Sequence, residues 1–151
     1  MTLKKANLLD IKQMQDIVKE EVENGIILFR SNNEIATNIR SYTIALKDNN
    51  IIGYGALHIH TDSLAEIRSL VVSKDFQGQG VGKKIVQALL SEAKELNLKD
   101  IFTLTYKEDF FKKLGFRVIP KESLPEQKIW ADCIKCKHFP VCNEVSLIIN
   151  I

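Results

Sequence analysis

The residues whose spacing suggests chemistry most directly are three glycines at alternate positions, Gly78, Gly80 and Gly82, in the stretch SKDFQGQGVGKKIVQALL. Glycines lack a Cβ atom, so consecutive backbone N–H groups can converge on an anion. The start of a helix adds roughly half a positive charge, and Lys83 and Lys84 add full charges at its rim. A tight turn into a surface helix is the alternative, but such a turn needs one glycine rather than three. The pattern therefore favours a phosphate-binding loop.

Two familiar phosphate loops do not fit this spacing. A P-loop, G-x-x-x-x-G-K-[ST], would need a glycine at Gln77 and a hydroxyl at Lys84. A dinucleotide fingerprint, G-x-G-x-x-G, read from Gly78 would need a glycine at Lys83. What remains is Q-x-x-G-x-G, which begins at Gln77 after an apolar strand and opens an amphipathic helix.

The elements that must position this loop follow from hydrophobic periodicity. The strand before it covers residues 63–73, and the helix after it has an apolar stripe of Val81, Ile85, Leu89, Ala93 and Leu96. In chain order we also expect a strand over 3–8, a helix from an Asp10 cap to Asn24 and Gly25, a short helix over 34–40, a hairpin over 42–60, and, after the long helix, a strand over 100–106, a helix over 107–115 and strands over 116–120 and 144–150. The order β-α-α-β-β-β-α-β-α-β-β predicts a mixed α/β (α+β) fold without the strict alternation of a doubly wound sheet.

Length and charge limit the class of protein. The 151 residues correspond to one domain with a sizeable core. The 21 basic and 19 acidic residues give a net charge of +2 without a basic stripe, so nucleic acid is not an expected partner. No stretch approaches the ~20 apolar residues that span a membrane, and the N-terminus is not typical of a signal peptide. We expect a cytoplasmic protein that does not bind membranes; its oligomeric state stays open, a homodimer included.

Two motifs together resemble one enzyme family. The stretch IRSLVVSKDFQGQGVGKKIVQALL resembles the acetyl-CoA-binding motif of the GNAT acetyltransferases, and FFKKLGF (residues 110–116) is similar to their second signature. The resemblance covers nearly the whole chain. It implies a single GNAT domain over residues 1–151, with a central mixed sheet of six to seven strands flanked by about four helices, and acetyl-CoA as the co-substrate.

The resemblance also implies which residues bind coenzyme A. Amides from Gln79 to Lys83 would bind its pyrophosphate, and the strand containing Leu70 and Val72 would pair with its pantetheine arm, because alternate residues offer their backbone groups on one edge. The Leu70 amide would polarise the acetyl carbonyl. The full set of expected cofactor-binding residues is Leu70, Val71, Val72, Gln77, Gly78, Gln79, Gly80, Val81, Gly82 and Lys83.

Direct acetyl transfer to an amine needs a base and an acid. Glu66, on the strand before the glycine loop, is the candidate base, acting directly or through water; the alternative is a strand-end surface carboxylate paired with Arg68. In many GNAT enzymes a tyrosine that acts as the general acid stands where this chain has Phe111. Tyr106 is the nearest alternative acid here; the competing interpretation is that Tyr106 only packs at the edge of the core. A thiol with a pKa near ~8.5 can also leave into solvent unaided.

The acceptor is indicated by a second resemblance. The segment containing R-S-x-x-E (Arg30 to Glu34), LTYKEDFFKKLGF and the C-terminal run resemble short, single-domain N-acetylglutamate synthases, which lack the amino-acid-kinase domain that carries arginine feedback. Glutamate has two carboxylates and calls for two cations, preferably arginines. Arg30 matches the family's carboxylate-binding arginine, and Arg68 is our addition, whereas Arg40 is expected at the surface. Longer synthases use further basic residues on later segments, and this chain has no residues that match them. Glutamine, another amino acid or a protein N-terminus therefore stays open as the acceptor.

The remaining candidate site is a compact cysteine cluster, Cys133, Cys136, His138 and Cys142. These four ligands would suit zinc, but zinc modules usually use two separated pairs, so buried thiols are favoured and no metal is expected. Two further classes stay open beside an enzyme. One is a non-catalytic acyl-CoA-binding module, which would release no thiol with any acceptor. The other is a zinc-binding interaction domain, which would require stoichiometric metal.

Overall fold

A computed structural model describes residues 1–125 and 144–151 of the chain. The α-helices are α1 (Ile11–Glu23), α2 (Asn32–Thr37), α3 (Val81–Glu95) and α4 (Glu108–Lys113), and short 3-10 turns cover Leu8–Asp10, Ile39–Ser41, Lys74–Phe76 and Lys121–Ser123. The strands are β1 (Thr2–Lys5), β2 (Tyr42–Lys47), β3 (Asn50–Ile59), β4 (Leu64–Val72), β5 (Asp100–Thr105), β6 (Arg117–Ile119) and β7 (Val145–Asn150).

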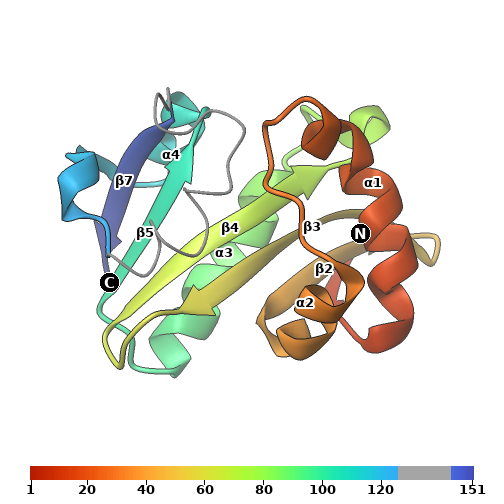
Figure 1. Ribbon diagram of the computed structural model, residues 1–151, viewed down its shortest axis with the longest axis horizontal. Helices are drawn as coiled ribbons and strands as arrows, with labels where there is room; N and C mark the ends of the chain where they lie inside the picture. The colour runs from red at the N-terminus through yellow and green to blue at the C-terminus, as the bar shows by residue number, and fades with distance from the viewer. Residues whose placement is uncertain (126–143) are drawn as a thin grey trace.

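The strands form one mixed sheet in the order β1-β2-β3-β4-β5-β7-β6, in which only β4 and β5 are parallel. That parallel pairing is short: it runs from Leu64 opposite Asp100 to Glu66 opposite Phe102 and then stops. Figure 1 shows β4 and β5 beginning side by side and then separating. The separation opens the sheet at its centre, on the side where both strands end.

Helices cover both faces of the sheet. On one face α3 and α4 bury Ile85, Leu89 and Phe111 against the strands, and Figure 1 shows α3 behind β4. On the other face α1 and α2 bury Met14 and Ile35 against β2, β3 and β4.

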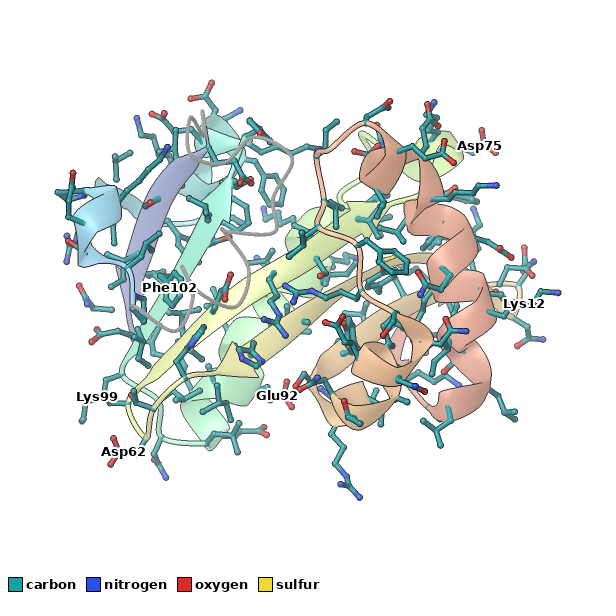
Figure 2. The ribbon with its side chains drawn as sticks, in the orientation of Figure 1. Lys12, Asp62, Asp75, Glu92, Lys99 and Phe102 are labelled. Carbon is teal, nitrogen blue, oxygen red and sulfur yellow. The ribbon has the colours of Figure 1, made fainter. Side chains whose placement is uncertain are left out.

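The long strand β4 joins the two regions that matter for function. Figure 2 places Asp62 in the turn that leads into β4 and Asp75 in the turn beyond its opposite end, immediately before the glycine loop. Phe102 lies on β5, close to the paired ends of the two strands. A residue in the middle of β4 is therefore held between the hairpin turn and the glycine loop.

The predicted mixed α/β fold and its element order are confirmed, with differences at the ends of elements. Six to seven strands and about four helices were expected, and the described residues form seven strands and four α-helices. The first strand ends at Lys5 rather than at residue 8, because Asn7 and Asp10 form a capping box around a 3-10 turn. Asp10 precedes α1 but gives it no side-chain cap, since its carboxylate accepts from the Asn7 amide at 2.8 Å. The last strand before the C-terminal segment is shorter than the 116–120 expected. Leu96 does not extend the buried stripe of α3, because it is 51% exposed beyond the helix end.

Candidate active site

A cleft of about 780 Å³ lies where β4 and β5 separate. Its described walls come from β4, the glycine loop, β5, α4 and the connection between α1 and α2. All but one of the residues predicted for the site line it: Arg30, Glu66, Arg68, Leu70, Val71, Val72, Gln77, Gly78, Gly80, Val81, Gly82, Lys83 and Tyr106. The exception is Gln79, whose side chain instead donates to the Asp75 carbonyl at 3.4 Å.

The β4 wall of the cleft carries a β-bulge. Tyr54 of β3 lies opposite Val71, but Ala56 lies opposite Arg68, so Ser69 and Leu70 together face the single residue between them on β3. Ser69 has φ +57°, an uncommon conformation for a residue other than glycine. A bulge takes residues out of the regular hydrogen-bonding ladder and turns the strand. The backbone expected to polarise the acetyl carbonyl therefore lies at an irregular, cleft-lining point of β4.

The glycine loop provides backbone donors at the start of α3. Gly80 is the N-cap of α3 and has φ +81°, and Gly78 has φ +78°. The first helical bond runs from the Lys84 amide to the Gly80 carbonyl (3.1 Å), so the three preceding amides of the first turn have no acceptor within the helix. A Cβ atom at either of these glycines would meet nothing within 4 Å, so conformation rather than crowding requires glycine there. These donors, with Lys83 beside them, suit a phosphate group.

A single methyl group in this loop should weaken binding of acetyl-CoA. Because Gly80 has φ +81°, Gly80→Ala forces a side chain into the left-handed region, at about 1–2 kcal/mol. We expect the loop to relax away from this geometry and the KM for acetyl-CoA to rise about tenfold. Gly115, with φ +100°, is the matched control, because it lies outside the cleft lining. Gly115→Ala should lose comparable stability in a thermal melt and leave that KM unchanged; equal KM values for the two variants would contradict a phosphate role for the loop.

Glu66 lies inside β4 and is buried, with 1% of its surface exposed. The alternative interpretation of Glu66 as a strand-end surface carboxylate is therefore wrong. The sheet register places Glu66 between His58 on β3 and Phe102 on β5. Its Oε1 atom lies 3.0 Å from Nε2 of His60. A buried carboxylate that lines the cleft and has a hydrogen-bonding partner is suited to act as a base. Sequence reasoning missed His60, although the alternation H-I-H on β3 was a usable signal.

Both candidate acceptor-binding arginines lie near one buried phenol, that of Tyr42. Burial raises the pKa of Tyr42, while the positive charges of Arg68 and Arg30 and a hydrogen bond with Ser69 act in the opposite direction. The net direction is upward, so Tyr42 stays a neutral hydroxyl near neutral pH. Arg30 also lies 3.7 Å from a carboxylate oxygen of Glu34. The two guanidinium groups line the cleft, and guanidinium groups there are suited to carboxylates. Tyr42 was not predicted, because its place beside Arg68 depends on the register of three strands.

The R-S-x-x-E motif has a structural reason besides its place in the cleft. Ser31 is the N-cap of α2, and its hydroxyl accepts from the Glu34 amide at 3.1 Å. The Arg30 carbonyl accepts from the side chain of Gln15 on α1 at 2.8 Å. The backbone at Arg30 is thus fixed from both sides. Its side chain is 11% exposed, which keeps the guanidinium directed away from bulk solvent.

The aromatic residues at the other wall separate into core and cleft. Phe111 is buried at 2% exposure and contacts Phe110 and Phe116 with ring centroids 5.1 Å apart in each case. Phe110 packs close to Gly82, where a Cβ atom would lie 3.4 Å from its ring. Tyr106, just beyond β5, lines the cleft and is 39% exposed. Of the aromatic residues considered for the acid, Tyr106 is the one with a hydroxyl at the cleft.

The described residues contain neither a metal-binding cluster nor a membrane-spanning helix. Within residues 1–125 and 144–151, no group of three or more histidine, cysteine, aspartate or glutamate side chains is arranged to hold a metal ion. The cysteine cluster Cys133, Cys136, His138 and Cys142 lies outside the described residues. Over the same two described ranges, every helix is too short or too polar to span a bilayer.

Comparison with known proteins agrees with this geometry. Residues 9–116 match the acetyltransferase (GNAT) family. An uncharacterized N-acetyltransferase of Chlorobaculum tepidum is 34% identical over 146 residues, which are 97% of this chain and 94% of that protein. An amino-acid acetyltransferase of Buchnera aphidicola is 28% identical over 148 residues, which are 97% of this chain but 32% of that protein.

A solved structure matches the fold over nearly the whole chain. N-acetylglutamate synthase from Neisseria gonorrhoeae, in complex with coenzyme A and N-acetyl-glutamate, superposes with a TM-score of 0.88 at 23% sequence identity. The match covers 99% of this chain and 34% of that one. The chain thus spans about a third of the length of these longer relatives.

Proposed function

The chain belongs to the acetyltransferase (GNAT) family, and on that premise we propose that it transfers the acetyl group of acetyl-CoA to the α-amino group of L-glutamate. Membership of the family makes it an acetyl-CoA-dependent N-acetyltransferase. The glutamate acceptor is supported mainly by one observation: Arg30 and Arg68 line the same cleft as Glu66. The reaction would be the first step of arginine biosynthesis, in the cytoplasm, carried out by a single domain formed by residues 1–151.

The donor is proposed to lie along β4 and the glycine loop. Backbone amides at the start of α3 and the charge of Lys83 would bind the pyrophosphate of coenzyme A. Gln77 stabilises this loop, because its side chain donates to the Val72 carbonyl at 3.1 Å. The edge of β4 after Glu66 no longer pairs with β5 and can offer backbone groups to the pantetheine arm. The Leu70 amide at the bulge would then stabilise the negative charge that develops on the acetyl oxygen.

The acceptor is proposed to lie on the opposite side of β4, between the α1–α2 connection and Tyr42. Arg30 and Arg68 would each bind one carboxylate of glutamate, since a guanidinium matches a carboxylate with two parallel hydrogen bonds. The neutral Tyr42 hydroxyl could donate to one of them. Two arginines in a small pocket disfavour a polyamine, which carries positive charge. Glutamine lacks one carboxylate and would leave one arginine with weaker compensation.

The proposed chemistry is a direct transfer. Glu66 takes a proton from the α-ammonium group, directly or through water, which frees the nitrogen lone pair. The nitrogen forms a bond to the acetyl carbon and loses a further proton to solvent, while the carbon–sulfur bond breaks and the electron pair leaves on sulfur. The Tyr106 hydroxyl or solvent then protonates the thiolate. The products are N-acetylglutamate and free coenzyme A, and no covalent enzyme intermediate is required.

Release of the free thiol of coenzyme A tests this proposal. With acetyl-CoA and a panel of single amino acids, we expect turnover with glutamate and a preference over glutamine of about tenfold or more in kcat/KM, since one ion pair is lost. A preference for glutamine would revise the acceptor and leave the transferase intact. Binding of acetyl-CoA without thiol release for any amino acid would favour the acyl-CoA-binding module instead. Omitting the amino acid gives the background hydrolysis rate.

A further inference from the structure

The side chain that contacts the proposed base, His60, has no role in the chemistry described above. Glu66 Oε1 lies 3.0 Å from His60 Nε2, and the two side chains are 1% and 8% exposed. The two residues come from neighbouring strands: His60 directly follows β3, and Glu66 lies within β4. The pair is thus a buried contact at the inner end of the cleft, between the hairpin turn and the bulge.

The imidazole ring of His60 is itself fixed in orientation. It contacts the ring of His58 edge to face, with centroids 4.8 Å apart, and the ring of Phe102 with centroids 5.3 Å apart. Its backbone amide donates to the Leu64 carbonyl at 2.9 Å. Aromatic neighbours on two strands and a backbone bond to a third position hold the ring against Glu66. Such a ring can restrict the rotamers of the side chain that it bonds.

Electrostatics define which way the hydrogen bond runs. Glu66 must be ionised to act as the proposed base, and an ionised carboxylate has no proton to donate; in that state Nε2 of His60 carries the proton and donates it to Glu66. Removing a carboxylate from water is unfavourable unless hydrogen bonds replace the lost solvation, and bonds to an ionised acceptor are stronger than neutral ones. The other charged or titratable side chains on β3, β4 and β5 are Tyr54, His58, Arg68 and Asp100.

We propose that His60 is a positioning residue for acetyl transfer: its Nε2–H holds the Glu66 carboxylate in the orientation in which it accepts a proton from the acceptor amine. The proposal rests on the proposed role of Glu66 as base. Misplacement of a catalytic group by about 1 Å is enough to lower a rate by about 100-fold. Loss of the donor should therefore affect kcat rather than the binding of either substrate.

Three substitutions separate positioning from packing. His60→Phe keeps an aromatic ring against His58 and Phe102 but cannot donate, and should lower kcat about 30-fold with both KM values changed less than threefold. His60→Gln keeps an amide donor near the Nε2 position and should recover kcat to within about fivefold of wild type. His60→Asn, with a shorter amide, should resemble His60→Phe, and it carries the comparison if the phenylalanine variant does not fold. Circular dichroism checks the fold of each variant.

A double-mutant cycle with Glu66→Gln completes the test. If His60 acts through Glu66, His60→Phe should lower kcat by less than about threefold once Glu66 is glutamine. The assay uses whichever amine the wild type acetylates, so a wrong acceptor does not affect it. Full activity of Glu66→Gln would overturn the base role and with it this proposal. An active His60→Phe beside an inactive Glu66→Gln would overturn positioning alone, as would equal losses in the glutamine and phenylalanine variants of His60.

A spectroscopic measurement needs no turnover. In ¹⁵N NMR spectra of the protein near pH 8, the His60 ring should have its proton on Nε2, and Glu66→Gln should shift that nitrogen because the charged acceptor is lost. The exposed substitution Glu92→Gln, on α3, is the control and should leave the His60 signal unchanged. A ring protonated on Nδ1, or one that does not respond to Glu66→Gln, would contradict the proposal.

Discussion

Replacing Glu66 by glutamine is expected to lower kcat for acetyl transfer by about 100-fold or more, with the KM for acetyl-CoA nearly unchanged. A positioned general base typically contributes ~10²–10⁴-fold, and Glu66 is the buried carboxylate of β4 at the cleft. Glutamine keeps the size of the side chain and a carbonyl oxygen, but it cannot accept a proton from the amine. The measurement is the initial rate of thiol release at saturating acetyl-CoA, across a range of amino-acid concentrations.

A surface carboxylate provides the control for this change. Glu92 on α3 bonds Lys5 at 3.0 Å and is partly exposed, and it does not line the cleft. Glu92→Gln removes a carboxylate of the same kind and should leave kcat within about twofold, because exposed ion pairs contribute little. If Glu66→Gln retained more than a tenth of the wild-type kcat, another group or solvent would have to accept the proton.

Replacing either cleft arginine by alanine is expected to raise the KM for glutamate at least about 30-fold. Truncating one partner of a buried charged contact costs about 2–5 kcal/mol, and 2 kcal/mol corresponds to roughly a 30-fold change in binding. The KM for acetyl-CoA should change much less, since neither arginine belongs to the glycine loop. One of the two arginines would bind the side-chain carboxylate of glutamate. Replacing that arginine should also remove most of the preference for glutamate over glutamine. Kinetics with both amino acids measure the two effects.

Arg40 is the matched control for the arginine variants. It is exposed in the middle of the 3-10 turn Ile39–Ser41, after α2, and does not line the cleft. Arg40→Ala removes the same side chain and the same charge and should leave both KM values within about twofold. Unchanged glutamate KM values in Arg30→Ala and Arg68→Ala would remove the basis for a dicarboxylate acceptor.

Local sequence patterns were sufficient for most of the fold. The helical stripe of α3 and the alternation within β3 and β4 each lie within one segment, so the element order could be read directly. The hairpin turn after β2 was equally clear, because Asp48 and Asn49 adopt the positive φ values, +53° and +65°, that this turn requires. Errors occurred at element ends, where competing local bonds decide the boundary. Asp10 illustrates this, since it bonds Asn7 rather than capping α1.

The candidate site was only partly predictable, because its side chains meet through sheet register. Glu66 and Arg68 are two residues apart, which suggested a pair on one strand. The bond from His60 depends instead on how β3 and β4 align, and Tyr42 lies beside Arg68 because β2, β3 and β4 align in turn. Spacing along the chain contains no such information. The glycine loop was predictable because loop and helix are contiguous, whereas the bulge at Ser69 has no sequence signature of its own.

Identification of the product tests the proposed reaction most directly. The protein is incubated with acetyl-CoA and an equimolar mixture of the common amino acids, and acetylated products are identified by mass spectrometry while free coenzyme A is measured in the same sample. The proposed function predicts N-acetylglutamate as the main product, in an amount equal to the coenzyme A released, and its loss in Glu66→Gln. Release of coenzyme A without any acetylated amino acid, or a dominant product from an amino acid without a second carboxylate, would contradict it.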